Sequence, residues 1–138
     1  MNNLLRIKNL SVSFNIDNKI SSAVKNISLD VARGEALGIV GESGSGKSVT
    51  ALSVLKLLPY PTAFHPSGEI YYNNKNILNS TEEELQKIRG NNISMIFQEP
   101  MTSLNPLHNI RKQVTEVLFL HKNLSDKEAE NRAIELLD

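Results

Sequence analysis

The residues from Gly41 to Ser48 have the types and the spacing that phosphate binding requires. They read Gly-Glu-Ser-Gly-Ser-Gly-Lys-Ser, a complete P-loop pattern of glycine, four variable residues and Gly-Lys-Ser. Glycines let consecutive backbone N–H groups converge on one anion without a clash from Cβ. Lys47 supplies a full charge for the β- and γ-phosphates, and Ser48 supplies a hydroxyl for Mg²⁺. We therefore predict a site for a nucleoside triphosphate and Mg²⁺.

The segments on either side of this loop predict a buried strand followed by a helix. Residues 36–40 form a short apolar run, which is typical of a parallel strand buried on both faces. From Lys47 to Leu58 the apolar residues recur at helical spacing, and Pro59 ends the helix. The N-terminus of this helix would add its unpaired N–H groups and its dipole to the anion site. A glycine-rich turn that matches by accident is the alternative, and at average composition it occurs in roughly one such chain in a few hundred.

Gln98 is a second candidate site residue. It follows residues 93–97, which we expect to form another buried strand. Ligands of open α/β sheets lie at the carboxyl ends of strands. The amide oxygen of Gln98 could therefore reach the same site as Ser48 and bind Mg²⁺ or hold a water. A glutamine that merely ends a strand at the surface is the commoner situation.

The rest of the chain predicts strands first and helices afterwards. Two capping boxes, Ser80 with Glu83 and Ser125 with Glu128, would begin helices, and Gly90 would end the first of them. A polar turn is expected at residues 17–19, and a bend near Asn9. The expected strands are residues 4–7, 12–14, 24–31, 36–40, 69–72, 77–78 and 93–97. The expected helices are residues 47–58, 80–90, 109–121 and 125–138.

Composition narrows the class of protein. The 138 residues include 40% hydrophobic and 22% charged residues, which is typical of a soluble globular domain. Fifteen basic residues balance fifteen acidic ones, so binding of nucleic acid through bulk charge is not expected. The absence of cysteine excludes disulfides, zinc–cysteine sites and thiol nucleophiles. No apolar run approaches the ~18 residues of a membrane-spanning helix, and the N-terminus lacks a signal-peptide pattern.

Together these segments resemble one family, the ATP-binding subunits of ABC transporters, and within it the subunits that drive bacterial oligopeptide, dipeptide and nickel importers. The resemblance is carried by residues 41–48 and by Phe-Gln-Glu-Pro-Met-Thr-Ser-Leu-Asn-Pro at 97–106. The second string is the more specific, because ABC proteins generally vary after the glutamine. Residues 10–14, 23–28 and 34–35 match as well, so the resemblance spans essentially the whole chain.

The resemblance implies an α/β fold, the N-terminal part of the P-loop NTPase fold of ABC ATPases. It would contain an antiparallel β subdomain, the start of a parallel core sheet with the P-loop helix, and part of a helical subdomain. Residues 1–98 would be the ATP-binding core with the β subdomain, and residues 99–138 the start of the helical subdomain. The whole chain, 1–138, would be an incomplete nucleotide-binding domain.

The resemblance also implies a role for individual residues. Phe14 would stack on adenine, although by itself it is more simply a strand core residue. Gln98 would take the Q-loop role, contacting Mg²⁺ and the attacking water, and residues 99–106 would form a coupling surface for the membrane partner. The expected catalytic residues are Lys47 and Gln98, and the expected metal contacts are Ser48 and Gln98. The expected ATP-binding residues are Phe14, Gly41, Glu42, Ser43, Gly44, Ser45, Gly46, Lys47, Ser48 and Val49. Val49 stands where many P-loops carry a second hydroxyl.

Three motifs of the family do not occur in the sequence: the Leu-Ser-Gly-Gly-Gln-type signature, a second strand ending in Asp-Glu, and a downstream histidine that senses the γ-phosphate. His65, His108 and His121 are not in that context, and we interpret them as ordinary histidines. We therefore expect the length to reflect a cut. The chain alone would bind ATP·Mg²⁺ weakly and not hydrolyse it, and its unpaired apolar edge at residues 36–40 would make it marginally stable and prone to associate.

As the complete protein, the resemblance implies an ATPase that powers import of peptides or nickel. Its partners would be transmembrane permease subunits and a second ATP-binding subunit, in a homo- or heterodimer, at the cytoplasmic face of the cell membrane and without nucleic acid. Two alternatives remain: a soluble ABC ATPase that serves no transporter, and a truncated, non-catalytic nucleotide-binding module.

Overall fold

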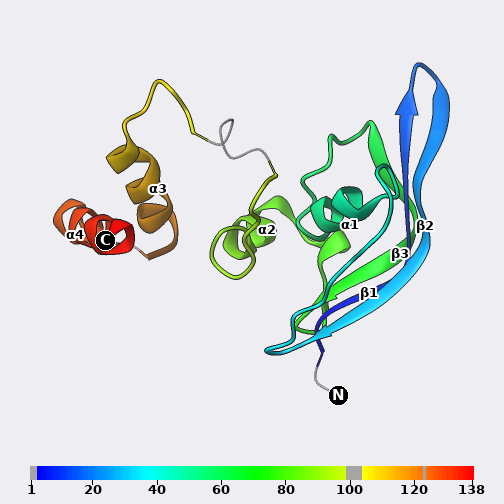
Figure 1. Ribbon diagram of the computed structural model, residues 1–138, viewed down its shortest axis with the longest axis horizontal. Helices are drawn as coiled ribbons and strands as arrows, with labels where there is room; N and C mark the ends of the chain where they lie inside the picture. The colour runs from blue at the N-terminus through cyan, green and yellow to red at the C-terminus, as the bar shows by residue number, and fades with distance from the viewer. Residues whose placement is uncertain (1–2, 99–103, 123) are drawn as a thin grey trace. The chain divides into compact units, whose positions relative to one another are not determined.

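The computed structural model describes residues 3–98, 104–122 and 124–138. The chain forms two compact units, residues 1–85 and 86–138. The first unit is built on a sheet of four antiparallel strands in the order β2-β1-β3-β4 (Figure 1). These strands are β1 (Asn3–Ile16), β2 (Lys19–Ala32), β3 (Ala63–Tyr72) and β4 (Lys75–Asn76).

The polar turn expected at residues 17–19 is a two-residue turn of Asp17 and Asn18, and Lys19 already belongs to β2. Asp17 and Asn18 have φ angles of 50° and 61°, which are the positive values that a tight type I′ hairpin requires. The expected bend near Asn9 is a bulge rather than a break, so that β1 runs through it as one strand. Opposite the bulge, Gly68 has a φ of +107°, and a Cβ there would lie 2.4 Å from Leu10 Cα. Glycine is therefore required where β3 passes this bulge.

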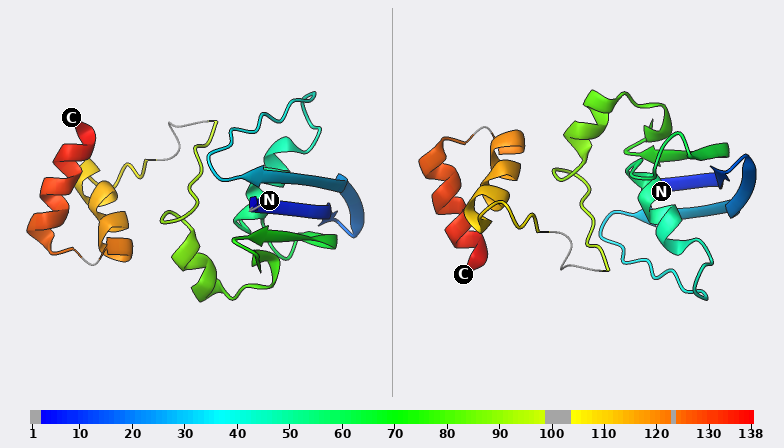
Figure 2. Two further views of the ribbon diagram at one scale, coloured as in Figure 1. Left: turned by 90° about the horizontal axis from the view of Figure 1, so that it is seen from below. Right: turned by 90° about the horizontal axis from the view of Figure 1, so that it is seen from above.

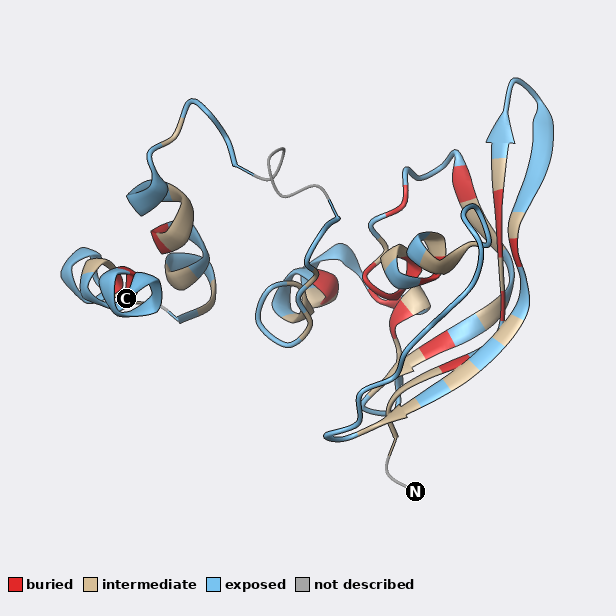
Figure 3. Ribbon diagram, viewed as in Figure 1, coloured by how far each residue is buried: buried red, intermediate tan, exposed pale blue. Residues whose placement is uncertain are grey.

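The core of the first unit lies between one face of the sheet and the helix α1 (Lys47–Val54) (Figures 1, 2 and 3). The buried apolar residues of the sheet are Ile7, Leu10, Val12, Val24, Ala63 and Ile70, and those at the end of α1 and in the segment after it are Val54, Leu55 and Leu58. The helix is shorter than expected because Lys56 turns left-handed, with a φ of 50°. The N–H of Leu57 then donates to Leu52 O, and that of Lys56 to Ser53 O, which is a Schellman ending.

The prediction that residues 36–40 and 93–97 are buried strands is wrong for the described structure. Neither segment is a strand, apart from a single bridge between Ile93 and Arg89. Val40 is 94% exposed and Ile96 is 98% exposed. A buried parallel strand is stable only when neighbouring strands pair with it, and no other described segment does so here. The expected start of a parallel core sheet is therefore not formed among these residues.

Two further local predictions need correction. Ile77–Asn79 form a 3₁₀ helix, η1, rather than a strand, because the Asn76 side chain accepts a hydrogen bond from Leu78 N–H and caps it. The first capping box lies one residue later than expected. Thr81 Oγ1 accepts from Glu84 N–H, and Glu84 accepts from Thr81 N–H, at the start of α2 (Glu82–Ile88).

The second unit contains two longer helices, α3 (Ile110–Lys122) and α4 (Asp126–Leu137), after the turn that ends α2. Gly90 has the predicted left-handed conformation, with a φ of +77°. The predicted capping box of Ser125 and Glu128 is formed at the start of α4. Ala129 and Ala133 are buried, and Arg111 of α3 pairs with Glu130 of α4 at 3.2 Å. Among the described residues, no helix is both long and apolar enough to cross a bilayer.

A candidate phosphate-binding loop

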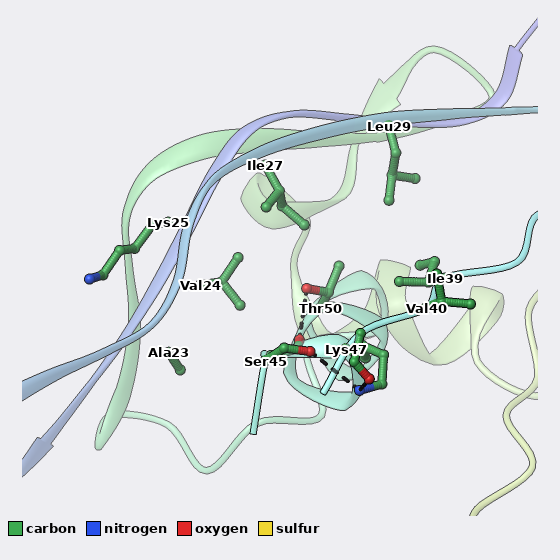
Figure 4. Close-up of a pocket in the computed structure, with 12 residues that line it drawn as sticks. Ala23, Val24, Lys25, Ile27, Leu29, Ile39, Val40, Ser45, Lys47 and Thr50 are labelled. Carbon is green, nitrogen blue, oxygen red and sulfur yellow. Dashed lines mark hydrogen bonds between the residues drawn. The ribbon is translucent and has the colours of Figure 1, made fainter. Parts of the chain in front are cut away.

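The glycine-rich loop ends at the N-terminus of α1, as the sequence predicts (Figure 4). Gly46 is the N-cap, with a φ of 90°, and no side chain caps the helix. The first turn of α1 contains no acidic residue. Its backbone N–H groups therefore remain available to an anion, which the positive end of the helix dipole also attracts.

Gly46 fixes the loop against strand β2. A Cβ at Gly46 would lie 2.6 Å from Ala23 O and 2.9 Å from Val24 Cγ2, closer than side chains approach in proteins. Thr50 anchors the same residue from within the helix, because its Oγ1 donates to Gly46 O at 2.9 Å. The position of the loop thus depends on β2 and on the first turn of α1.

Lys47 holds the loop closed around its own ammonium group. Its Nζ donates to Gly41 O at 2.8 Å and to Glu42 O at 2.7 Å, and lies 3.3 Å from Ser45 Oγ. In Figure 4 the side chains of Lys47 and Ser45 lie side by side at the loop. These three oxygens hold the positively charged ammonium group at the centre of the loop. Phosphate oxygens could replace them as hydrogen-bond acceptors of Lys47.

A cavity of about 400 Å³ lies between this loop and β2 (Figure 4). Its lining is mainly apolar on the β2 side, and Ser45, Gly46 and Lys47 form the loop side. The lining residues that sequence reasoning missed as part of the site are Ala23, Val24, Lys25, Ile27, Leu29, Ile39, Val40 and Thr50. The alternation of Val24, Ile27 and Leu29 was a signal, but it predicts only that one face of the strand is buried.

The remaining predicted site residues are distributed over both units. Ser48 is exposed in the first turn of α1, and Val49 is half-buried beside it. Phe14 is half-buried in β1, where it pairs with Ser21 and Ala63, and it does not line the cavity described above.

Gln98 lies in the second unit, exposed at a bend. Most of the predicted coupling segment, residues 99–103, lies outside the described residues. Within the described part of the chain, no group of three or more histidine, aspartate or glutamate side chains could hold a metal ion.

Comparison with known proteins identifies the family. The chain matches the ABC transporter family over residues 24–138. It is 54% identical over 134 residues to the peptidoglycan transport ATP-binding protein YejF of Agrobacterium fabrum. That match covers 97% of this chain and 24% of the relative. It is 46% identical over 135 residues to the oligopeptide transport ATP-binding protein OppD of Bacillus subtilis. That match covers 98% of this chain and 38% of the relative.

The fold agrees with solved structures of the same kind. The ATP-binding cassette MJ0796, solved as a dimer in a post-hydrolysis state with ADP and Pi bound, superimposes with a TM-score of 0.80 at 31% identity. The match covers 96% of this chain and 55% of that one. The chain spans less than half the length of the curated relatives that it matches. The family match, the relatives and the shared fold together show that this chain belongs to the ABC transporter family.

Proposed function

We propose that this chain is the ATP-binding part of a subunit that powers peptide import through an ABC transporter. The observation that carries the proposal is the loop from Gly41 to Ser48, which surrounds the Lys47 ammonium group at an uncapped helix N-terminus. Relatives named as oligopeptide and dipeptide transport ATP-binding proteins favour peptides over nickel as the cargo. We expect permease subunits and a second ATP-binding subunit as partners, at the cytoplasmic face of the membrane.

In this proposal the loop binds the phosphates of ATP. The N–H groups of the first turn of α1 and the Lys47 ammonium group would contact the β- and γ-phosphates. Ser48 would contact Mg²⁺, which neutralises charge on the β- and γ-phosphates when it is bound. Phe14 would stack on adenine, and Gln98 would hold the attacking water in the complete protein. The division into an ATP-binding core, residues 1–98, and a helical subdomain from residue 99 is part of the same proposal.

The first test is ATP binding. We expect Lys47→Ala to weaken ATP binding at least about tenfold, because it removes charge-assisted hydrogen bonds worth roughly 1.5–3 kcal/mol. Lys19→Ala is the matched control, because Lys19 is an exposed lysine of the same unit beside the hairpin turn. Titration with a fluorescent ATP analogue measures both variants. Equal affinity of Lys47→Ala and wild type would refute the role of the loop.

The second test separates a transporter subunit from a free ATPase. The full-length protein should co-purify with membrane permease subunits, and its ATP hydrolysis should respond to them. A full-length protein that hydrolyses ATP at the same rate with and without the membrane fraction would contradict the proposed role in transport. A protein that binds no ATP in either condition would contradict the assignment of the loop itself.

A further inference from the structure

His65 lies where the segment that follows α1, the helix at the end of the phosphate loop, contacts the sheet. It belongs to β3, and its side chain is half-buried. The ring nitrogen Nε2 is buried and has no hydrogen-bond partner among the residues that the structure describes. The ring of Tyr60, from the segment between α1 and β3, packs on the imidazole with centroids 5.7 Å apart and planes tilted by 34°. A neutral imidazole tolerates this position, because an unprotonated nitrogen requires no acceptor.

Lys56 is the charged residue that acts on this ring. The Lys56 ammonium group donates to Leu78 O at 3.1 Å and so ties the end of α1 to η1. Burial lowers the pKa of His65 below its ordinary value of 6.5, and the positive charge of Lys56 lowers this pKa further. Both groups that act on the ring, Tyr60 and Lys56, come from the segment that follows α1. A protonated His65 would therefore place a second cation beside Lys56 and a buried N–H without an acceptor.

We propose that His65 makes the end of the phosphate-loop helix sensitive to acid, because protonation of its ring disrupts the packing of Tyr60 and the Lys56–Leu78 bond. α1 has eight residues, so its two ends lie only about 12 Å apart at 1.5 Å per residue. Loosening one end alters the position of Lys47 at the other. The consequence for nucleotide affinity rests on the proposed function, whereas the consequence for stability does not.

The sign of the effect follows from linkage. Because the pKa of His65 is lower in the folded protein, the unfolded chain takes up its proton first. The stability that depends on a neutral ring is fully present above pH 6.5. It is lost as the pH falls through the lowered pKa of the folded state.

The experiment compares full-length wild type with His65→Gln between pH 5 and 8. Thermal unfolding and the Kd for a fluorescent ATP analogue are measured at each pH. His108→Gln is the matched control, because His108 lies in the other unit, beside Lys112. The terminal phosphate of the nucleotide also titrates in this range, and the comparison of variants removes its contribution.

From pH 7.5 to 5.5, we expect the Kd of wild type to rise more than that of His65→Gln, because only wild type has a ring at position 65 that can be protonated. The Tm of wild type should fall more steeply, and His108→Gln should follow wild type. Lys56→Gln should reduce the pH dependence of Tm, because it removes the neighbouring charge. Parallel pH profiles of wild type and His65→Gln would overturn the proposal.

Two readouts keep the inference separate from the proposed function. Loss of ATP binding at every pH would contradict the nucleotide site, while the Tm profile would still test His65. NMR titration of the histidine rings gives a direct check. A midpoint for His65 at or above the ordinary value of 6.5 would overturn the proposal even if all variants fold equally well.

Discussion

Replacing Gly46 by alanine should displace the phosphate loop from β2. Its φ of +90° is left-handed, which costs a residue with a Cβ about 1–2 kcal/mol. The added Cβ would also meet Ala23 O at 2.6 Å and Val24 Cγ2 at 2.9 Å. The first of these is backbone in a paired strand and cannot rotate away, so overpacking adds about 1–3 kcal/mol. We expect a total loss of about 2–5 kcal/mol in stability, a large part of the usual 5–15 kcal/mol.

Two other glycines separate the contributions to this cost. Gly44 is also left-handed, with a φ of +79°, but a Cβ there meets no atom of the described residues within 4 Å. Gly44→Ala should therefore show only the conformational cost of about 1–2 kcal/mol. Gly38 has neither a left-handed φ nor a neighbour within 4 Å, so Gly38→Ala should be close to neutral. The destabilisation should therefore increase from Gly38 to Gly44 to Gly46.

Thermal unfolding and ATP titration measure this order. For a unit of this size, each kcal/mol lowers Tm by about 4–8 °C, so Gly46→Ala should lower it by at least about 8 °C. Its ATP affinity should fall as well, because the N–H groups of α1 no longer converge as in wild type. If Gly46→Ala and Gly44→Ala have the same Tm and the same Kd, the loop does not pack on β2 as described.

Two further predictions concern the base and the helix caps. If Phe14 stacks on adenine, Phe14→Ala should weaken ATP binding by about 1–3 kcal/mol and leave the affinity for inorganic triphosphate unchanged. Calorimetry measures both affinities. Equal losses of affinity for the two ligands would exclude stacking. The pKa of Glu84 is lowered by its hydrogen bond with Lys75, and that of Glu128 by its hydrogen bond with Ser125. The stability that these capping carboxylates give their helices should be complete above pH 4.5 and lost as the pH falls through the lowered values. Circular dichroism at 222 nm between pH 5 and 3 would measure this loss. An unchanged acid transition in the double variant Glu84→Gln, Glu128→Gln would contradict the prediction.

Features that depend only on residues close together in the sequence were predictable from it. The turn at Asp17 and Asn18, the loop at the start of α1, the left-handed Gly90 and the cap of α4 all form as expected. Each requires a particular residue type at a short fixed spacing. The P-loop pattern was informative for the same reason, because its glycines, its lysine and the helix start all lie within eight consecutive residues.

The position of the first capping box shows where local information ends. Ser80 with Glu83 and Thr81 with Glu84 have the same spacing, so the sequence allows either box. In the structure Glu84 also pairs with Lys75 of β4, a residue of the sheet. This contact from outside the helix adds to the second box, and a pattern of four residues cannot contain it.

The apolar runs at residues 36–40 and 93–97 were mispredicted for a different reason. Hydrophobic runs of this length indicate burial, but burial of a parallel strand depends on partner strands that the run does not encode. No described segment pairs with residues 36–40, so Leu37 and Ile39 remain 45% and 48% exposed. The cavity lining was missed for the same reason, because residues of β2 and the last residues of this unpaired run, Ile39 and Val40, line the cavity together.

The phosphate loop keeps its shape although the segment before it is not a strand. Gly46 contacts the backbone of β2, Thr50 Oγ1 bonds to Gly46 O, and Lys47 bonds to the carbonyls of Gly41 and Glu42. All of these contacts lie within residues 23–50, and none requires residues 36–40 to be paired. A strand that paired with residues 36–40 would bury their apolar side chains without replacing any contact that shapes the loop. The shape of the loop therefore depends on β2 and α1, which is why the contact at Gly46 is the sharpest place to test the proposed site.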